Sequence, residues 1–192
     1  MKVIDVSDYQ TNIDWSKVID EGVQGVIVKV SEGRTLMELF AKHIASAAAR
    51  GLKWGVYCLT RAPSEERAIQ EADVLIDALE ALGYGIPDMG IWYDVEPDEA
   101  ETHDPEELTA LCSAFISECN RRGYSAGIYG NYTTLNRINT GDLADYVPYW
   151  AAQYSYSNDF KEEHPELRVI AWQWSDQYEI DGQPFDMNDW ED

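Results

Sequence analysis

Short apolar runs alternate with amphipathic stretches along most of the chain. The apolar runs are rich in valine, isoleucine and tyrosine, which is typical of buried strands. Between them, apolar residues recur every three or four positions, the spacing of one helix face. This alternation predicts parallel strands joined by crossover helices. The strand candidates are Val3 to Val6, Gly25 to Val30, Lys53 to Leu59, Gly90 to Val95, Ser125 to Tyr129, Tyr149 to Gln153 and Val169 to Trp174.

Three segments have helical periodicity, and the third has the clearest ends. Asp104 can cap its first turn, Pro105 suits the first helical position, and Glu107 completes a capping box. Gly123 follows two arginines as a stop signal. The predicted helices are Leu36 to Arg50, Ser64 to Leu82 and Pro105 to Arg122.

Two distant segments share a pattern: Arg50 to Tyr57 matches Arg122 to Tyr129. Each predicts a helix stop followed by a strand that ends in tyrosine, although the common glycine stop explains part of the match. If the two units are equivalent, both tyrosines lie at the same end of a sheet or barrel. Function in such folds collects at the C-terminal ends of the strands.

The helical pattern fades after Tyr129, and strand-like runs with short polar connections follow up to Trp190. A complete eightfold α/β repeat is therefore not expected. The chain has 192 residues, of which 45% are hydrophobic and 26% charged, and no linker or low-complexity tract interrupts it. A chain of this size and composition forms one core. We expect one domain over residues 1–192 with one active site.

The formal net charge of -22 limits the possible partners. Nucleic acids and anionic membranes attract clustered lysine and arginine, and this chain has only 14 such residues. We therefore expect no nucleic acid partner and no membrane insertion, and no pattern points to an obligate protein partner. Solubility alone also explains the charge.

The cysteines do not suggest a disulfide framework. Cys112 and Cys119 lie on one predicted helix at a Cα separation of about 10 Å, beyond the ~7 Å limit of a disulfide. The N-terminus has no apolar signal sequence, and no run approaches the ~20 apolar residues of a membrane span. We expect synthesis in the cytoplasm followed by release, as for a phage lysin, or secretion if a signal was trimmed.

The strongest chemical signal is an apolar run, Ile91 to Val95, that contains Asp94 and precedes Glu96. A period of two places both carboxylates on one strand face, with their Cα atoms about 6.7 Å apart. Two neighbouring carboxylates resist ionising together, so the pKa of one rises and that group keeps its proton. Glycoside cleavage needs such an acid beside an ionised group. Solvated strand-end acids or a metal site would give the same pattern.

Further candidates occupy similar settings. Asp5 follows the first apolar run and Asp186 lies near the end of the chain, so both could converge on one cleft. Aromatic rings at strand ends can receive the apolar faces of sugars, and glutamine side chains beside them can bind hydroxyl or acetamido groups. The binding candidates are Tyr57, Tyr129, Trp150, Gln153, Tyr154, Trp172, Gln173 and Trp174, although such aromatics are more often core residues.

The sequence lacks the motifs of other catalytic chemistries. His43, His103 and His164 are isolated and form no zinc-binding motif, so we expect no metal and no cofactor. No nucleophile elbow and no phosphate-binding loop is present. A cysteine nucleophile at Cys58 would need a histidine partner that the sequence does not nominate.

Taken together, the motifs resemble the lysozymes of glycoside hydrolase family 25. They occur in the order of that family and span nearly the whole chain. Cys58 and Leu59 depart from it, because many relatives have histidine and an aromatic residue there. The matching segments are Asp5 to Gln10, Val26 to Gly33, Gly55 to Tyr57, Trp92 to Glu96, Gly127 to Asn131, Tyr149 to Tyr154, Trp172 to Ser175 and Asp186 to Asn188.

This resemblance implies an α/β fold, a flattened and irregular TIM-like barrel of five βα units followed by three strands. It implies an N-acetylmuramidase, a lysozyme that cleaves peptidoglycan with retention at the anomeric carbon. Glu96 then corresponds to the general acid and Asp94 to its partner, with Asp5 and Asp186 as flanking acids. Many relatives carry wall-binding repeats after the catalytic domain, and we expect these to be absent or trimmed here.

Several alternatives stay open at this point. Asp94 could attack the anomeric carbon directly, or it could orient the substrate's acetamido group as the nucleophile, which we favour. A chitinase-like or N-acetylglucosaminidase activity would use the same pair of acids. A non-catalytic module that binds cell-wall glycan would explain the aromatic residues but not the pair.

Overall fold

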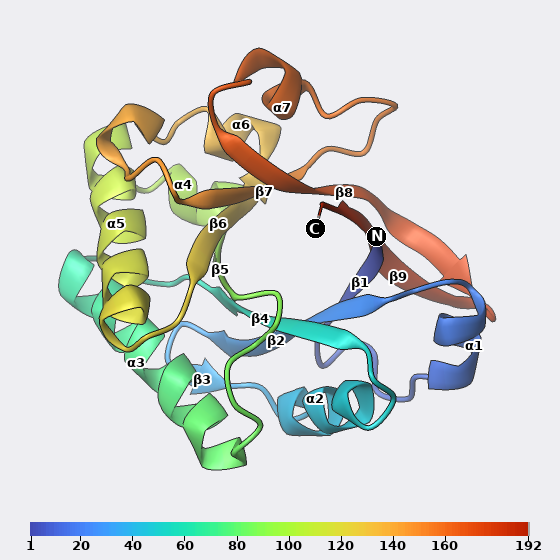
Figure 1. Ribbon diagram of the computed structural model, residues 1–192. Coiled ribbons are helices and arrows are strands. Elements are labelled where there is room, and N and C mark those ends of the chain that lie inside the picture. The colour runs from blue at the N-terminus through green and yellow to red at the C-terminus, as the bar shows by residue number, and fades with distance from the viewer. Residues whose placement is uncertain (192) are drawn as a thin grey trace.

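The strands close into a barrel in the computed structural model, which describes residues 1–191 (Figure 1). In this part of the chain a nine-stranded sheet has the order β1-β9-β8-β7-β6-β5-β4-β2-β3, and β1 also pairs with β2, which closes the ring. All neighbours in the ring are parallel except β9, which runs antiparallel to β8 and β1. The strands are β1 (Lys2–Val6), β2 (Gly25–Glu32), β3 (Thr35–Leu36), β4 (Lys53–Leu59), β5 (Ile91–Val95), β6 (Ala126–Asn131), β7 (Pro148–Ala152), β8 (Arg168–Ile180) and β9 (Gln183–Trp190).

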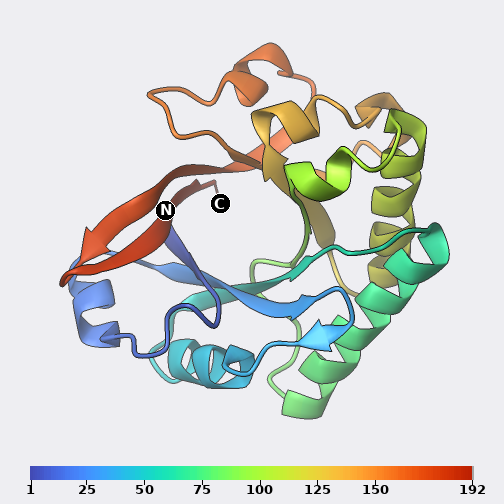
Figure 2. The ribbon, with the colours of Figure 1, turned by 180° about the vertical axis from the view of Figure 1, so that it is seen from behind.

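Helices cover part of the outside of the barrel. Figures 1 and 2 show α2, α3 and α5 along one side, whereas the β8–β9 hairpin projects without a long helix over it. The predicted architecture of five βα units followed by three strands is confirmed. None of the helices in residues 1–191 has the length and apolar character needed to cross a bilayer. The helices are α1 (Trp15–Asp20), α2 (Phe40–Ala48), α3 (Glu65–Leu82), α4 (Pro97–Ala100), α5 (Pro105–Arg121), α6 (Tyr132–Leu135) and α7 (Asp159–Glu163), with a 3-10 turn at Thr140–Asp142.

Two apolar layers hold the barrel together. The larger lies between the strands and the helices, where the predicted capping box of Asp104 and Glu107 starts α5. The smaller fills the barrel, with Trp92 edge-on to Trp150 and Trp190 at centroid distances of 5.8 and 5.2 Å. Gly127 leaves room for this cluster, because a Cβ there would lie 2.7 Å from the Trp92 ring. This plug closes the middle of the barrel, so polar interior side chains gather beyond it.

The two matching segments are structurally equivalent, as predicted. Gly51 and Gly123 follow α2 and α5 with φ angles of 70° and 88°, a left-handed conformation that glycine adopts without strain. Each is followed by a strand, β4 or β6, that carries an inward tyrosine two residues before its end.

The predicted start of helix α2 and the predicted end of strand β8 were wrong, and strand β9 was missed. Helix α2 begins at Phe40 instead of Leu36, because Leu36 pairs in β3 and the Asp8 carboxylate binds the backbone N–H groups of Glu38 and Leu39 at 2.9 Å. Strand β8 continues past Trp174 to Ile180 through bulges in its pairing with β9. Strand β9 was not among the candidates, since its polar residues mask the alternation.

Candidate active site

One cleft at the C-terminal end of the barrel brings the predicted acids together. Asp5 on β1 lies directly across from Asp186 on β9, and Asp94 on β5 and Glu96 after it line the same hollow of about 320 Å³. We call this hollow the acid cleft. Lys29, Tyr9 and Tyr57 also line it.

Asp5 is the centre of a buried hydrogen-bond network. Its Oδ2 accepts from Asn188 Nδ2 at 2.8 Å and from Gln173 Nε2 at 3.0 Å. Asn188 in turn accepts from the indole N–H of Trp150 at 2.8 Å. Each amide has its nitrogen bound to the Asp5 carboxylate, which fixes the orientation of the amide group. The floor of the cleft is therefore preorganised.

Two tyrosines hold the other side of this network. The hydroxyl groups of Tyr129 and Tyr154 both donate to Gln173 Oε1, at 2.8 and 2.9 Å. Burial raises the pKa of Tyr129 well above 10, with further contributions from Asp94 and Asp5, so this hydroxyl remains a donor. Gln173 therefore links the tyrosines to Asp5.

The cross-strand position of Asp5 and Asp186 and their burial favour one proton held between the two carboxyl groups. Burial and the charge of Asp5 raise the pKa of Asp186 to about 9, and protonated Asp186 donates to Asp5. Burial also raises the pKa of Asp5, while its bonds to Asn188, Gln173 and Asp186 oppose that shift. Two carboxylates directly opposite on neighbouring strands could not both ionise without strong repulsion.

Asp94 and Glu96 have different surroundings although they are two residues apart. Asp94 is 5% exposed, and its Oδ1 has no hydrogen-bond partner among the described residues. Burial, followed by the charge of Glu96, raises the pKa of Asp94 well above its ordinary value. The predicted rise within the pair therefore occurs at Asp94, and desolvation contributes more than the neighbouring carboxylate.

Glu96 is exposed and begins α4 with Pro97 at the next position. Its carboxylate does not cap the helix and has no hydrogen bond or ion pair with residues 1–191. It lines the acid cleft and also a second hollow of about 410 Å³, which we call the tyrosine hollow because Tyr129, Tyr132 and Tyr154 line it. Glu96 thus lies between two spaces, each large enough for part of a sugar chain.

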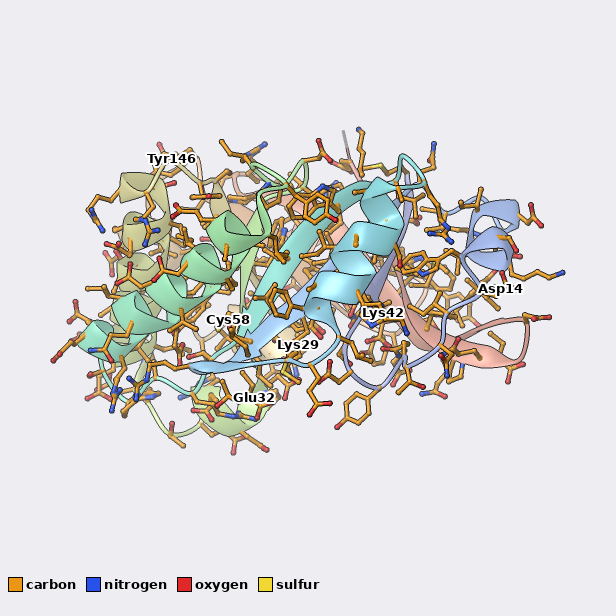
Figure 3. The ribbon with its side chains drawn as sticks, turned by 90° about the horizontal axis from the view of Figure 1, so that it is seen from below. Asp14, Lys29, Glu32, Lys42, Cys58 and Tyr146 are labelled. Atoms are coloured by element: carbon orange, nitrogen blue, oxygen red, sulfur yellow. The ribbon has the colours of Figure 1, made fainter. Side chains whose placement is uncertain are left out.

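Lys29 is a residue of this site that the sequence analysis did not select. It is 9% exposed, and its Nζ donates to Glu32 Oε2 at 2.9 Å. Its charge lowers the pKa of Asp94, opposing burial and Glu96. Figure 3 shows Lys29 and Glu32 together, far from Tyr146. The signal was present, because Lys29 is a charged residue within the apolar run Val26 to Val30.

The family comparison agrees with this geometry, since the model of glycosyl hydrolases family 25 matches residues 4–183. The chain belongs to glycosyl hydrolase family 25. The predicted resemblance is therefore confirmed. Within residues 1–191, no group of three histidine, cysteine, aspartate or glutamate side chains is arranged to hold a metal ion.

Family 25 relatives include longer proteins. The autolytic lysozyme of Clostridium acetobutylicum is 25% identical over 95% of this chain and 52% of its own length. The modular autolysin LytC of Streptococcus pneumoniae is 25% identical with a TM-score of 0.84, over 97% of this chain and 46% of that one. The chain thus spans about half the length of these relatives. The catalytic domain of endolysin ply40, from a Listeria monocytogenes phage, shares the fold at 21% identity with a TM-score of 0.79, over 98% and 91% of the two chains.

Most predicted residues of this family 25 site face the two hollows. Tyr57 lines the acid cleft, and its hydroxyl has no partner in the described part of the chain. Tyr129 and Tyr154 line the tyrosine hollow. Gln153 lines it too, but its amide is held by the Asp159 side chain and backbone at 2.6 and 2.8 Å. Gln173 lies beneath, buried in the network of Asp5.

Three predicted binding residues, Trp150, Trp172 and Trp174, do not line the acid cleft or the tyrosine hollow. Trp174 packs edge-on against Tyr178 at a centroid distance of 5.5 Å. Trp150 is 2% exposed within the aromatic plug of the barrel, so a sugar cannot stack on its ring. Trp172 alternates with the inward Gln173 along β8 and lines a separate hollow with Asn158 and Lys161. The prediction that these rings contact sugar is corrected: Trp150 orients Asn188, and the Trp172 indole donates to the Gln153 carbonyl at 2.8 Å.

The shared proton predicts that fold stability decreases with pH. The pKa of Asp186 is about 9 in the folded chain against an ordinary value of 3.8, so between these values only the folded state keeps the proton. The stability that this retained proton contributes to the fold is fully present below about pH 4 and is lost as the pH rises to about 9. Asp186→Asn cannot ionise, so we expect its Tm to vary less over this window and to exceed the wild-type Tm at pH 8, by about 2 to 4 °C per kcal/mol recovered.

Differential scanning calorimetry of both proteins between pH 5 and pH 9 measures this difference. A wild-type Tm that increases over this range, or an Asp186→Asn profile parallel to that of the wild type, would contradict the shared proton.

Proposed function

We propose that this chain is an N-acetylmuramidase, which hydrolyses the β-1,4 bond from N-acetylmuramic acid to N-acetylglucosamine in peptidoglycan. Membership of family 25 supports the reaction class. The observation that carries the proposal is the position of Glu96, an exposed carboxylate without a partner in residues 1–191, between two hollows. A general acid must lie beside the bond that joins the sugars on its two sides.

The two hollows suit different halves of the cleavage site. The acid cleft holds the groups that could stabilise positive charge at the anomeric carbon, so we place the muramic acid residue there. The tyrosine hollow offers rings against which the leaving N-acetylglucosamine can pack. The glycosidic oxygen would then lie next to Glu96.

The proposed reaction proceeds in two steps. Glu96 donates its proton to the glycosidic oxygen while the acetamido carbonyl oxygen attacks the anomeric carbon, which breaks the glycosidic bond and forms an oxazolinium ring. Water then attacks the same carbon from the opposite face and opens the ring, and the Glu96 carboxylate takes the proton of that water. Two inversions give net retention.

Asp94 suits the orienting role better than direct attack. Asp94 and Glu96 line the same cleft two residues apart, so both approach the bond from one side, whereas direct attack must come from the side opposite the acid. Asp94 Oδ1, buried and without a partner among the described residues, is an acceptor for an acetamido N–H. Binding this N–H would aim the acetamido oxygen at the anomeric carbon and stabilise the charge that develops on the ring.

Digestion of two purified substrates tests the proposed function. We expect the chain to release reducing ends from peptidoglycan and to leave chitin, which lacks muramic acid, nearly intact. Comparable cleavage of chitin would favour the chitinase-like alternative. Binding of peptidoglycan with no release of reducing ends would favour a non-catalytic wall-binding module. A preparation of Glu96→Gln serves as the control for contaminating hydrolases.

A further inference from the structure

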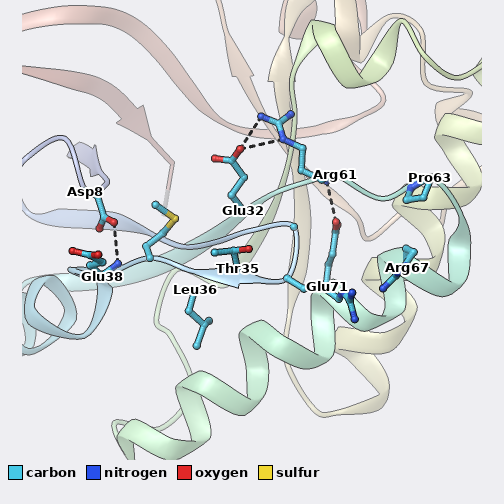
Figure 4. Close-up of a pocket in the computed structure, with 12 residues that line it drawn as sticks. Asp8, Glu32, Thr35, Leu36, Glu38, Arg61, Pro63, Arg67 and Glu71 are labelled. Atoms are coloured by element: carbon cyan, nitrogen blue, oxygen red, sulfur yellow. Dashed lines mark hydrogen bonds and ion pairs between the residues drawn. The ribbon is translucent and has the colours of Figure 1, made fainter.

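A cavity of about 800 Å³ lies beside the acid cleft (Figure 4). It is formed by the ends of β2 and β3, the loop after β4 and the first turns of α3. Glu32 and Arg61 line it and are joined by hydrogen bonds of 3.0 and 3.2 Å. Because Glu32 also binds Lys29 in the acid cleft, the two spaces share this wall. We call the larger one the lateral cavity.

Most carboxylates that line the lateral cavity already have partners within the protein. Asp8 accepts the two backbone N–H groups at the start of α2. Glu71 is 2% exposed and accepts from the Thr60 hydroxyl, the Tyr93 hydroxyl and the Arg61 backbone, at 2.9 to 3.0 Å. Glu32 is paired with Lys29 and Arg61. These carboxylates are therefore compensated within the protein.

Two cations of the cavity have no acidic partner. The exposed side chain of Arg34 makes no ion pair or hydrogen bond with residues 1–191. Arg67 donates to the neutral Gln70 at 2.9 Å. Among the carboxylates of this cavity, that of Glu38 makes neither a hydrogen bond nor an ion pair with residues 1–191, and Figure 4 places it across the cavity from Arg67. In a chain of net charge -22, two uncompensated arginines in one cavity favour an anionic ligand.

We propose that the lateral cavity binds the stem peptide carried by the muramic acid residue in the acid cleft. This inference rests on the proposed function. The stem is a short peptide with free carboxylates attached to the lactyl group of muramic acid, and some stems carry a free amine. Arg34 and Arg67 would bind carboxylates, Glu38 would bind the amine, and Leu36 and Pro63 provide apolar contact. A neutral sugar would need none of these charges.

The preference for peptide-bearing over peptide-free glycan tests this proposal. Peptidoglycan strands are compared before and after an amidase removes their stems, and the measured quantity is the ratio of kcat/KM for the two substrates. We expect Arg34→Gln and Arg67→Gln each to lower this ratio about fivefold, the factor that corresponds to about 1 kcal/mol for a partly exposed charge contact. The change should occur mainly in KM.

Arg50→Gln is the matched control, because Arg50 is exposed and bonds only to the Ser46 carbonyl at 2.9 Å. Its ratio should equal that of the wild type. An unchanged ratio in the Arg34→Gln, Arg67→Gln double variant would overturn the proposal. So would an equal loss on both substrates, which would indicate a general effect of charge.

A binding measurement separates this inference from the proposed function. The soluble tripeptide L-alanyl-γ-D-glutamyl-L-lysine is titrated into the protein and followed by NMR. We expect saturable shifts in the wild type and Arg50→Gln, and their loss in the double variant. This result does not depend on cleavage, so it tests whether the lateral cavity binds the stem peptide even if neither glycan is hydrolysed. Equal binding by all three proteins, or by none, would overturn the inference.

Discussion

Glu96→Gln is expected to lower the rate of peptidoglycan cleavage by about 10² to 10⁴, the usual contribution of a general acid. The amide keeps the shape of the side chain but cannot donate the proton to the leaving oxygen. Because the Glu96 carboxylate has no partner among residues 1–191, its replacement removes no internal contact of the described fold. Activity should therefore be lost without loss of stability, which steady-state assays and a thermal melt measure together.

Asp98→Asn is the matched control for this variant. Asp98 is an exposed acid in the short helix α4, which follows Glu96, and it lines neither hollow. It should retain nearly full activity and a wild-type Tm. A Glu96→Gln enzyme as active as Asp98→Asn would overturn the assignment of the general acid.

Asp94→Asn is expected to lower the rate by about 10² to 10³, the effect of losing one electrostatic group at a reaction centre. Asparagine can still accept an N–H but cannot carry the charge that balances the oxazolinium ring. The fold should tolerate the change, because a buried carboxyl with a raised pKa destabilises the ionised protein at neutral pH. We expect an unchanged or higher Tm at pH 7.

Azide distinguishes the two roles of Asp94. If Asp94 were the nucleophile, the smaller Asp94→Ala variant would leave room for azide to attack, and a glycosyl azide of inverted configuration would form. If Asp94 orients the acetamido group, azide should restore no turnover in either variant. Detection of the inverted glycosyl azide by mass spectrometry and NMR would refute substrate assistance.

Local signals predicted much of the fold. Strand β4 begins and ends where the apolar run does, and the capping box of Asp104 and Glu107 marks the start of α5. The start of α2 was missed because Asp8, thirty residues away in sequence, caps it. Such a contact depends on the tertiary fold, which periodicity does not report.

The candidate site was predicted less completely. Alternation along a strand shows that Trp172 and Gln173 face opposite sides, but it does not show which side is the inside of the barrel. The structure places Gln173 inside and Trp172 outside. The sequence also did not show that Trp150 is buried, since a tryptophan suits either a core or a sugar-binding surface. The different environments of Asp94 and Glu96 follow from the closed barrel, because only Asp94 lies within it.

The new reducing end of the released fragments tests the central claim most directly. Peptidoglycan is digested to completion, the products are reduced with borohydride, and each fragment is identified by liquid chromatography and mass spectrometry. A muramidase leaves N-acetylmuramic acid at every new reducing end, so the reduced sugar should be N-acetylmuramitol throughout. Fragments that end in reduced N-acetylglucosamine would contradict the account, because the chain would then cut the other glycosidic bond.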